Sequence, residues 1–258
     1  MCAKTTICGV RTVKCEIYGF QKPPKYIGGF WVFAKCVKIT GMKKFLVITL
    51  FPEMFDKVIN SSMLWKAQDR QLASFDFVNL REFGIGAHRS VDDTPYGGGD
   101  GMLLRIDVLV SALEFAKSQD GFADAKVILL SPSETVWSQK MAEEFAKSDD
   151  NYILICGHYE GFDARIEKFI DAKISVGKFV LTGGELPAML MMDSIIRLIP
   201  GVLGGETSAE IESYSDGDNL EFPQYTRPEK FRELSVPEVL LSGHHEKIAK
   251  WRADKSSN

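Results

Sequence analysis

The chain has 258 residues, of which 45% are hydrophobic and 26% charged, and this is enough to bury a sizeable core in one large or two modest domains. No apolar run approaches the roughly 20 residues that cross a bilayer, so we expect no contact with a membrane. The net charge of −4 excludes a globally basic surface, and any nucleic acid would therefore bind a local cationic patch.

The five cysteines predict neither a disulfide framework nor a zinc site. Four of them precede Met42 at spacings that match no metal-binding pattern, and Cys156 lies alone in an apolar run. We interpret Cys156 as a small core residue, with a catalytic nucleophile as the alternative. The absence of a disulfide pattern fits a reducing, cytoplasmic location.

Residues 1–41 differ in composition from the rest of the chain. They carry seven Lys and Arg residues against the single acid Glu16. Met42 then opens the run Met-Lys-Lys-Phe-Leu-Val-Ile-Thr-Leu, which is typical of a first strand. Three interpretations of this extension stay open: an upstream start-site artefact, which we favour, a targeting arm poor in acids, or an accessory segment.

Beyond Met42, short β-rich runs alternate with helical patterns. This alternation predicts an α/β fold with a largely parallel sheet. The clearest helical patterns are at 112–117, 138–147 and 186–199, and the clearest strands are at 126–130, 152–156 and 178–181.

A second, smaller piece is expected at the C-terminal end. The acidic stretch 204–221 carries Gly and Ser without a clear period, which is typical of a linker. After it, 228–231 and 244–252 are predicted as helices. We therefore place a domain boundary in the linker.

Each of the three predicted strands ends in a segment suited to close backbone approach. The strands are followed by Ser131-Pro132, by Gly157-His-Tyr-Glu-Gly161 and by Thr182-Gly-Gly-Glu-Leu-Pro187. In open parallel sheets, ligands bind at the carboxyl ends of strands, where loops converge. A single glycine turn would need no ligand to explain it, but three at successive strand ends predict a binding pocket.

The known nucleotide fingerprints are missing. No Gly-x-Gly-x-x-Gly follows a strand, and no Gly-x4-Gly-Lys-Ser/Thr occurs, so a dinucleotide or ATP site of those types has no support. The run Gly97-Gly-Gly-Asp-Gly101 fits either an anion cradle or a hinge, and composition does not choose between them.

The loops belong to a longer collinear series of motifs. The series is Leu50-Phe-Pro-Glu-Met-Phe55, Val91-Asp-Asp-x-Pro-Tyr-Gly-Gly-Gly-x-Gly-Met102, Leu130-Ser-Pro132, Cys156-Gly-His-Tyr-Glu-Gly161, Leu181-Thr-Gly-Gly-Glu-Leu-Pro-Ala-Met189, Asp193-Ser-x-x-Arg197, Ile199-Pro-Gly-Val-Leu-Gly204, Tyr225-Thr-Arg-Pro228 and Val236-Pro-x-x-Leu-Leu-Ser-Gly243. With these motifs the chain resembles, from Met42 to about Arg252, bacterial tRNA (guanine-N1)-methyltransferase, the TrmD family of SPOUT-type methyltransferases. A set this long in one order is highly specific.

The resemblance implies a trefoil-knotted, parallel-sheet α/β domain at 42–203, the flexible linker 204–221 and a short helical tRNA-binding domain at 222–258. A knot is a rare exception to the rule that chains do not thread their own loops. The knotted loops would hold S-adenosylmethionine, the methyl donor. The residues carried over as donor-binding are Leu130, Ser131, Pro132, Gly157, Tyr159, Glu160, Val176, Gly177, Lys178, Phe179, Val180, Leu181, Gly183, Gly184, Leu186 and Pro187.

Two further residues are carried over as catalytic. Guanine N1 carries a proton at neutral pH, so its methylation needs a general base. The family's base is an aspartate in the linker, and Glu212 stands there in this chain, with a solvated linker charge, or Asp216 as the base, as alternatives. Arg197 would stabilise negative charge on the guanine O6, although a salt bridge to Asp193 one turn earlier is the plainer interpretation.

The resemblance also implies the substrate, the oligomeric state and a metal requirement. The target is the guanosine just 3′ of the anticodon, two subunits of a homodimer share each active site, and the family is reported to need Mg²⁺, for which no ligand cage can be named. A cationic face for phosphates would comprise Arg227, Lys230, Arg232, Lys247, Lys250 and Arg252.

The chain departs from the family pattern at several positions. These are Glu212, Lys178, where the family usually has an acid, and a C-terminus that ends soon after Arg252. They motivate an alternative: a catalytically weak or inactive relative that binds S-adenosylmethionine or tRNA.

Overall fold

The computed structural model describes residues 41–203, 213–214 and 220–256, together with the backbone of four short strands nearer the N-terminus. Those strands pair as two antiparallel hairpins within a separate unit, Met1–Ile39. They are β1 (Thr5–Ile7), β2 (Val10–Thr12), β3 (Lys25–Ile27) and β4 (Phe30–Val32).

Five strands form a parallel sheet in the order β11-β9-β10-β5-β6. Tyr152 of the central strand lies opposite Phe45 on one side and Lys126 on the other. All neighbouring pairs run parallel, which confirms the predicted α/β class. The strands are β5 (Lys43–Thr49), β6 (Ala73–Asn79), β9 (Lys126–Leu130), β10 (Tyr152–Cys156) and β11 (Ala172–Ile174).

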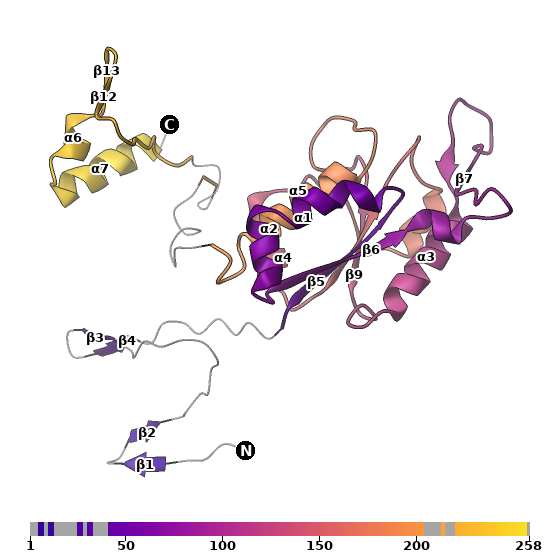
Figure 1. Cartoon of the computed structure of the whole chain (residues 1–258), viewed down its shortest axis with the longest axis horizontal. Helices are drawn as coiled ribbons and strands as arrows, with labels where there is room; N and C mark the ends of the chain where they lie inside the picture. Colours follow the sequence, from indigo (N-terminus) through magenta and orange to yellow (C-terminus); the bar gives the residue numbers. More distant parts are fainter. Residues whose placement is uncertain are drawn as a thin grey trace. The chain divides into compact units, whose positions relative to one another are not determined.

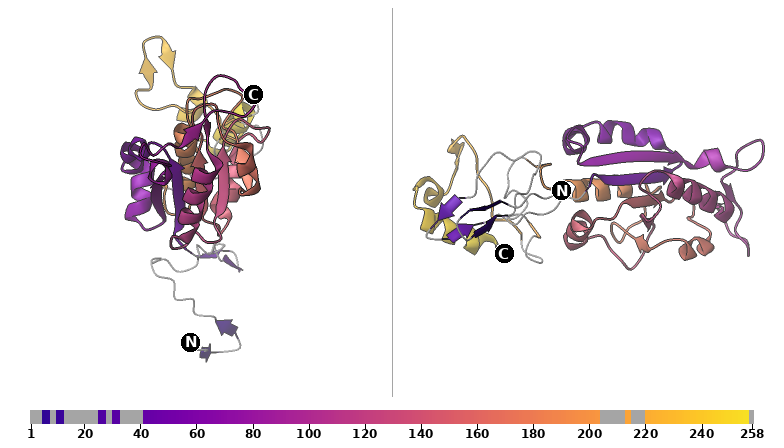
Figure 2. Two further views of the ribbon diagram at one scale, coloured as in Figure 1. Left: turned by 90° about the vertical axis from the view of Figure 1, so that its right-hand side faces the viewer. Right: turned by 90° about the horizontal axis from the view of Figure 1, so that it is seen from below.

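Helices cover both faces of the sheet (Figures 1 and 2). Side chains of β5 alternate between two cores: Phe45 and Val47 pack against α5 and its neighbours, whereas Leu46 and Ile48 pack against α3. Strands buried on both faces form continuous apolar runs, and for this reason the sequence located β9 and β10 to the residue. The helix on one face is α3 (Ile106–Ser118), and those on the other are α1 (Asp56–Ile59), α2 (Ser62–Asp69), α4 (Gln139–Lys147) and α5 (Glu185–Ile196).

The three helices predicted between 112 and 199 are confirmed, with shifted ends. Helix α3 begins six residues before the predicted 112–117. The Ser138 hydroxyl caps α4 by accepting a hydrogen bond from the Met141 N–H at 3.4 Å, and α5 follows Gly184 directly. Short connecting elements are the 3-10 helices Pro52–Phe55, Leu80–Phe83 and Ala164–Lys168 and the antiparallel strands β7 (Asp92–Asp93) and β8 (Leu103–Leu104).

The predicted strand at 178–181 is wrong. The strand is β11, a few residues earlier, and Lys178–Leu181 lies in the loop between β11 and α5. Its apolar side chains do not enter the core: Phe179 is 56% and Val180 85% exposed. An apolar run alone cannot distinguish a strand from a loop whose side chains line a pocket.

The Lys43 side chain connects β5 to the end of α4 through hydrogen bonds. Its amine is buried and donates hydrogen bonds to the carbonyls of Phe145 and Asp150, both at 3.1 Å, and of Ser148. Burial lowers the pKa of this amine, while Asp150 and Asp149 act in the opposite direction.

We expect Lys43→Met to destabilise the protein by about 1–3 kcal/mol, because three partly buried carbonyls would lose their donor. The matched control is Lys44→Met, which removes an ion pair with the exposed Asp120 carboxylate and an exposed hydrogen bond to the Asp120 carbonyl, and should cost markedly less. Urea unfolding of both variants, followed by circular dichroism, measures the difference. Equal losses would show that the Lys43 amine contributes nothing beyond an ordinary surface charge.

The C-terminal piece contains a hairpin as well as helices. Strands β12 (Lys230–Phe231) and β13 (Leu234–Ser235) pair across a turn in which Arg232 has a φ of 57°. The predicted helix at 228–231 is therefore wrong, because local pairing with Leu234 and Ser235 prevails there. The helices are α6 (Glu238–Leu241) and α7 (His245–Ser256).

None of the helices in the described residues has the length and apolarity that a membrane crossing requires.

Candidate functional site

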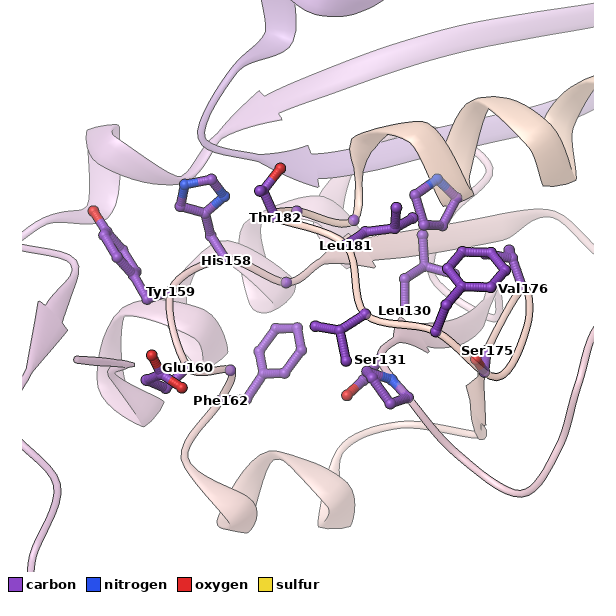
Figure 3. Close-up of a pocket in the computed structure, with 18 of the residues that line it drawn as sticks. Leu130, Ser131, His158, Tyr159, Glu160, Phe162, Ser175, Val176, Leu181 and Thr182 are labelled. Carbon is purple, nitrogen blue, oxygen red and sulfur yellow. The ribbon is translucent and has the colours of Figure 1, made fainter. Parts of the chain in front are cut away.

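The carboxyl ends of β11, β9 and β10 are neighbours in the sheet, and the loops that follow them line one pocket (Figure 3). The pocket encloses about 720 Å³ of empty space, which includes the space open to solvent at its mouth, and loops at the carboxyl ends of parallel strands are a usual place for a small-molecule site. Its lining residues are Leu130, Ser131, Pro132, Gly157, His158, Tyr159, Glu160, Gly161, Phe162, Ile174, Ser175, Val176, Phe179, Val180, Leu181, Thr182, Gly183, Gly184 and Pro187.

Glycines let two of these loops touch at the backbone. The Gly184 N–H donates a hydrogen bond to the Gly157 carbonyl at 2.8 Å. A Cβ on Gly184 would lie 2.6 Å from both the Cys156 Cα and the Gly157 nitrogen, closer than side chains come to backbone. The glycine is therefore required by close approach.

The pocket has apolar walls and one exposed carboxylate. Phe162, Val176 and Leu181 contribute apolar surface, as Figure 3 shows. The Glu160 side chain lies over Gly101, whose added Cβ would be 2.3 Å from the Glu160 Cγ, and the Glu160 N–H donates to the Met102 carbonyl at 3.0 Å. The pocket can therefore hold a largely apolar ligand that carries positive charge.

A second carboxylate, Glu185, is buried beneath the glycine turn. It is 3% exposed, and its Oε1 accepts a hydrogen bond from the Thr49 hydroxyl at 2.7 Å. Burial, and secondarily the charge of Glu185, raises the pKa of the Cys156 thiol well above its usual range. A thiol held neutral is a poor nucleophile, which supports the interpretation of Cys156 as a core residue.

His158 lies in the same loop as Gly157. Its ring makes edge contacts with Phe51 at 5.2 Å and Tyr159 at 5.0 Å between centroids. Its Nδ1 is shielded from solvent and has no hydrogen-bond partner among the described residues.

Across residues 41–203, 213–214 and 220–256, no group of three or more His, Cys, Asp or Glu side chains could hold a metal ion.

Comparisons with known proteins agree with this geometry. The model of the tRNA (guanine-1)-methyltransferase family TrmD matches residues 42–258. The chain is 49% identical over 209 residues to a tRNA (guanine-N(1)-)-methyltransferase of Staphylococcus carnosus, covering 81% of this chain and 83% of the relative. It is 50% identical over 213 residues to one of Desulfitobacterium hafniense, covering 83% and 79%, and 50% identical over 210 residues to one of Halalkalibacterium halodurans, covering 81% and 84%.

The chain belongs to the TrmD family.

Most of the residues that the TrmD resemblance assigns to the donor lie together in the structure. All of them except Gly177, Lys178 and Leu186 line the pocket. Lys178 and Leu186 are exposed beside it. The unusual lysine therefore does not contribute to the pocket wall.

The two proposed catalytic residues do not join this cluster. Glu212, and the fallback Asp216, lie outside the described residues. Arg197 follows the last residue of α5, whereas the pocket lies at the first turn of that helix. A helix of 12 residues at 1.5 Å per residue separates them by about 18 Å.

Sequence reasoning assigned no role to several lining residues of this TrmD pocket. His158, Gly161 and Thr182 lie within the quoted motifs and could have been included on that signal. Ile174 and Ser175 could not, because the strand that ends at Ile174 was predicted at 178–181 instead. The structure also brings Gly101 of the glycine-rich run to the pocket edge.

Proposed function

We propose that this protein is a tRNA (guanine-N1)-methyltransferase that binds S-adenosylmethionine in the pocket at the carboxyl ends of β9, β10 and β11, and methylates the guanosine just 3′ of the anticodon. The observation that carries the proposal is the convergence of three strand-end loops, all within the family match, on one pocket.

The residues of the pocket fit the donor. Its apolar walls suit the adenine ring and the methionine chain, and the exposed Glu160 carboxylate suits a ligand that carries a sulfonium and an ammonium group. The close contact between Gly184 and Gly157 keeps side chains out of the floor. The bound donor supplies an electrophilic methyl group, and the protein supplies its orientation.

The transfer also requires the guanine to lose its N1 proton. In the proposed reaction the Glu212 carboxylate accepts that proton, and N1 then attacks the methyl carbon as the bond from carbon to sulfur breaks. The Arg197 guanidinium stabilises the charge that develops on O6, an interaction stronger in the transition state than in the ground state.

Two subunits together form each active site in this proposal. Within one subunit the length of α5 separates Arg197 from the donor pocket, so a partner is the natural source of the arginine. Large exposed apolar side chains around the pocket support a covering partner: Val180, Leu186 and Leu190 are 85%, 57% and 47% exposed. Such a cluster is typical of an interface, and we propose a homodimer.

The remaining assignments follow the family. We propose that the parallel-sheet domain at 42–203 carries a trefoil knot, that 204–221 is a flexible linker and that 222–258 binds the anticodon stem-loop, with residues 1–41 as an extension of no assigned role. Within 222–258, the predicted cationic face is exposed. There Arg252 lies 4.8 Å from the centre of the Phe222 ring and Arg232 lies 5.2 Å from that of Phe231. Cations beside aromatic rings suit phosphates and unstacked bases.

We also propose a cytoplasmic location and a requirement for Mg²⁺, both of which the family resemblance implies. A tRNA substrate is consistent with the proposed cytoplasmic location.

The proposed function is tested by methyl transfer to unmodified tRNA, with N1-methylguanosine measured by mass spectrometry of the digested product. We expect Glu212→Ala to lower kcat by about 10²- to 10⁴-fold, since a general base is removed, and to leave donor affinity nearly unchanged in calorimetry. Glu212→Asp, which restores the family's residue, is the matched control and should retain or raise activity.

An absence of N1-methylguanosine at saturating donor would refute the enzyme and favour the inactive, binding-only relative. Loss of donor affinity in Glu212→Ala would show that this side chain is not the base but part of the donor site.

A further inference from the structure

His158 and Glu185 lie on either side of the glycine turn. Both the His158 Nδ1 and the Glu185 Oε2 are within 3.0 Å of the point that a Cβ on Gly183 would occupy. Only the missing side chain of Gly183 lets these two polar groups approach each other. The backbones of His158 and Gly183 also form an isolated antiparallel bridge there.

One unpartnered ring nitrogen and one carboxylate oxygen lie next to this point. The Nδ1 has no partner among the described residues and is shielded from water. In the buried Glu185 carboxylate, Oε1 accepts the Thr49 hydroxyl, which leaves Oε2 on the side of Gly183. A buried imidazole nitrogen without a partner destabilises the fold, and the Glu185 Oε2 offers a carboxylate acceptor beside the same glycine.

The position of the pair connects it to the pocket. His158 stands between Gly157 and Tyr159 in the loop after β10, and Glu185 follows Gly184 at the start of α5. All three of the named neighbours line the pocket. Figure 3 shows the His158 ring on the Thr182 side of its loop, opposite to Phe162. A bond between the two side chains would therefore fix the spacing of two loops that form the wall.

We propose that His158 and Glu185 are positioning residues: the His158 Nδ1–H donates a hydrogen bond to the Glu185 Oε2, and this bond holds the loop after β10 and the Gly183-Gly184 turn at the spacing that the methyl donor requires. Thr49 orients the carboxylate from its other oxygen. Neither side chain needs to touch the reacting atoms. The inference rests on the proposed donor site for its consequence, although the bond itself does not.

The bond is tested first without ligand, by long-range ¹H–¹⁵N NMR of the imidazoles in the full chain. The protein has four histidines, and the signal that His158→Asn removes belongs to His158. We expect the proton on Nδ1 in the parent protein and loss of that tautomer in Glu185→Gln. Glu144→Gln, which removes an exposed carboxylate from α4, should leave it unchanged. A proton on Nε2 in the parent protein would overturn the proposal.

The consequence is tested by calorimetry with S-adenosylmethionine and by kinetics. His158→Asn keeps an N–H donor near the Nδ1 position and should bind the donor almost as well as the parent. His158→Leu should bind it about tenfold more weakly, as expected for a lost hydrogen bond to a charged group, with kcat at saturating donor nearly unchanged. Equal affinity of the Asn and Leu variants would refute the positioning role.

The two hypotheses fail in different ways. If the parent protein binds no S-adenosylmethionine at all, the proposed function fails while the tautomer measurement still stands. If the parent binds the donor and His158→Leu binds it equally well, the donor site survives and only the inferred pair is wrong. Should Glu185→Gln not fold, the two His158 variants decide the question.

Discussion

Replacement of Gly184 by alanine is expected to weaken binding of S-adenosylmethionine by about 100-fold or more. The new Cβ would lie 2.6 Å from backbone atoms of Cys156 and Gly157, and neither can move as a flexible side chain would. The turn must shift by roughly 1 Å to relieve the overlap, and a shift of that size in a binding constellation costs on the order of 10²-fold. Calorimetry with the donor measures the loss.

The matched control is Gly41→Ala. An added Cβ there has nothing within 4 Å, so donor affinity should not change. Circular dichroism of Gly184→Ala at the assay temperature shows whether the fold persists. A folded Gly184→Ala variant that binds the donor normally would mean that the donor site lies elsewhere.

Mixing two inactive variants is expected to restore activity if two subunits share each site. Arg197→Ala alone should lower kcat by about 10²- to 10³-fold, the usual cost of removing a group that stabilises developing charge. Gly184→Ala alone should be nearly inactive at a donor concentration that the parent needs for saturation, because its donor affinity is expected to be about 100-fold lower. In a heterodimer of the two, one site combines the intact pocket of the first with the intact arginine of the second. The purified heterodimer should therefore show about half of the parent activity, and a randomly paired mixture of equal amounts about a quarter.

Co-expression with two different affinity tags, followed by a methyl-transfer assay of the doubly purified heterodimer, checks this result. The control mixes Arg197→Ala with Glu212→Ala. If one subunit supplies both Arg197 and Glu212 to the pocket of its partner, one site of this heterodimer lacks the arginine and the other lacks the glutamate, so neither site is intact. Recovery in neither mixture would place the arginine and the donor in one subunit and contradict the shared site.

Local pattern determined the central strands and most of the pocket. β9 and β10 are buried on both faces, so their apolar runs have a length and boundaries that only a central strand explains. The turn residues after them have few alternatives, because close backbone contact at Gly157 and Gly184 excludes side chains. The donor residues within these motifs therefore line one pocket, as the resemblance implied.

Other features depend on which residues meet across the fold. Phe179 and Val180 read as strand because they are apolar, but the sheet edge is taken by β11, and these side chains remain exposed at the pocket. The hairpin at Lys230 forms through pairing with Ser235. A hydrophobic pattern over only four residues, 228–231, carries no information about that pairing.

By itself the sequence determined the parallel α/β class, the family and the loops that form the pocket, because strand burial and glycine turns impose constraints within a few neighbouring residues. Only the tertiary structure decided that Arg197 lies a helix length from that pocket, that Glu160 lies against Gly101, and that His158 and Glu185 meet over Gly183. These contacts and separations depend on how the strands and helices pack in three dimensions. A local period in the sequence does not contain that information.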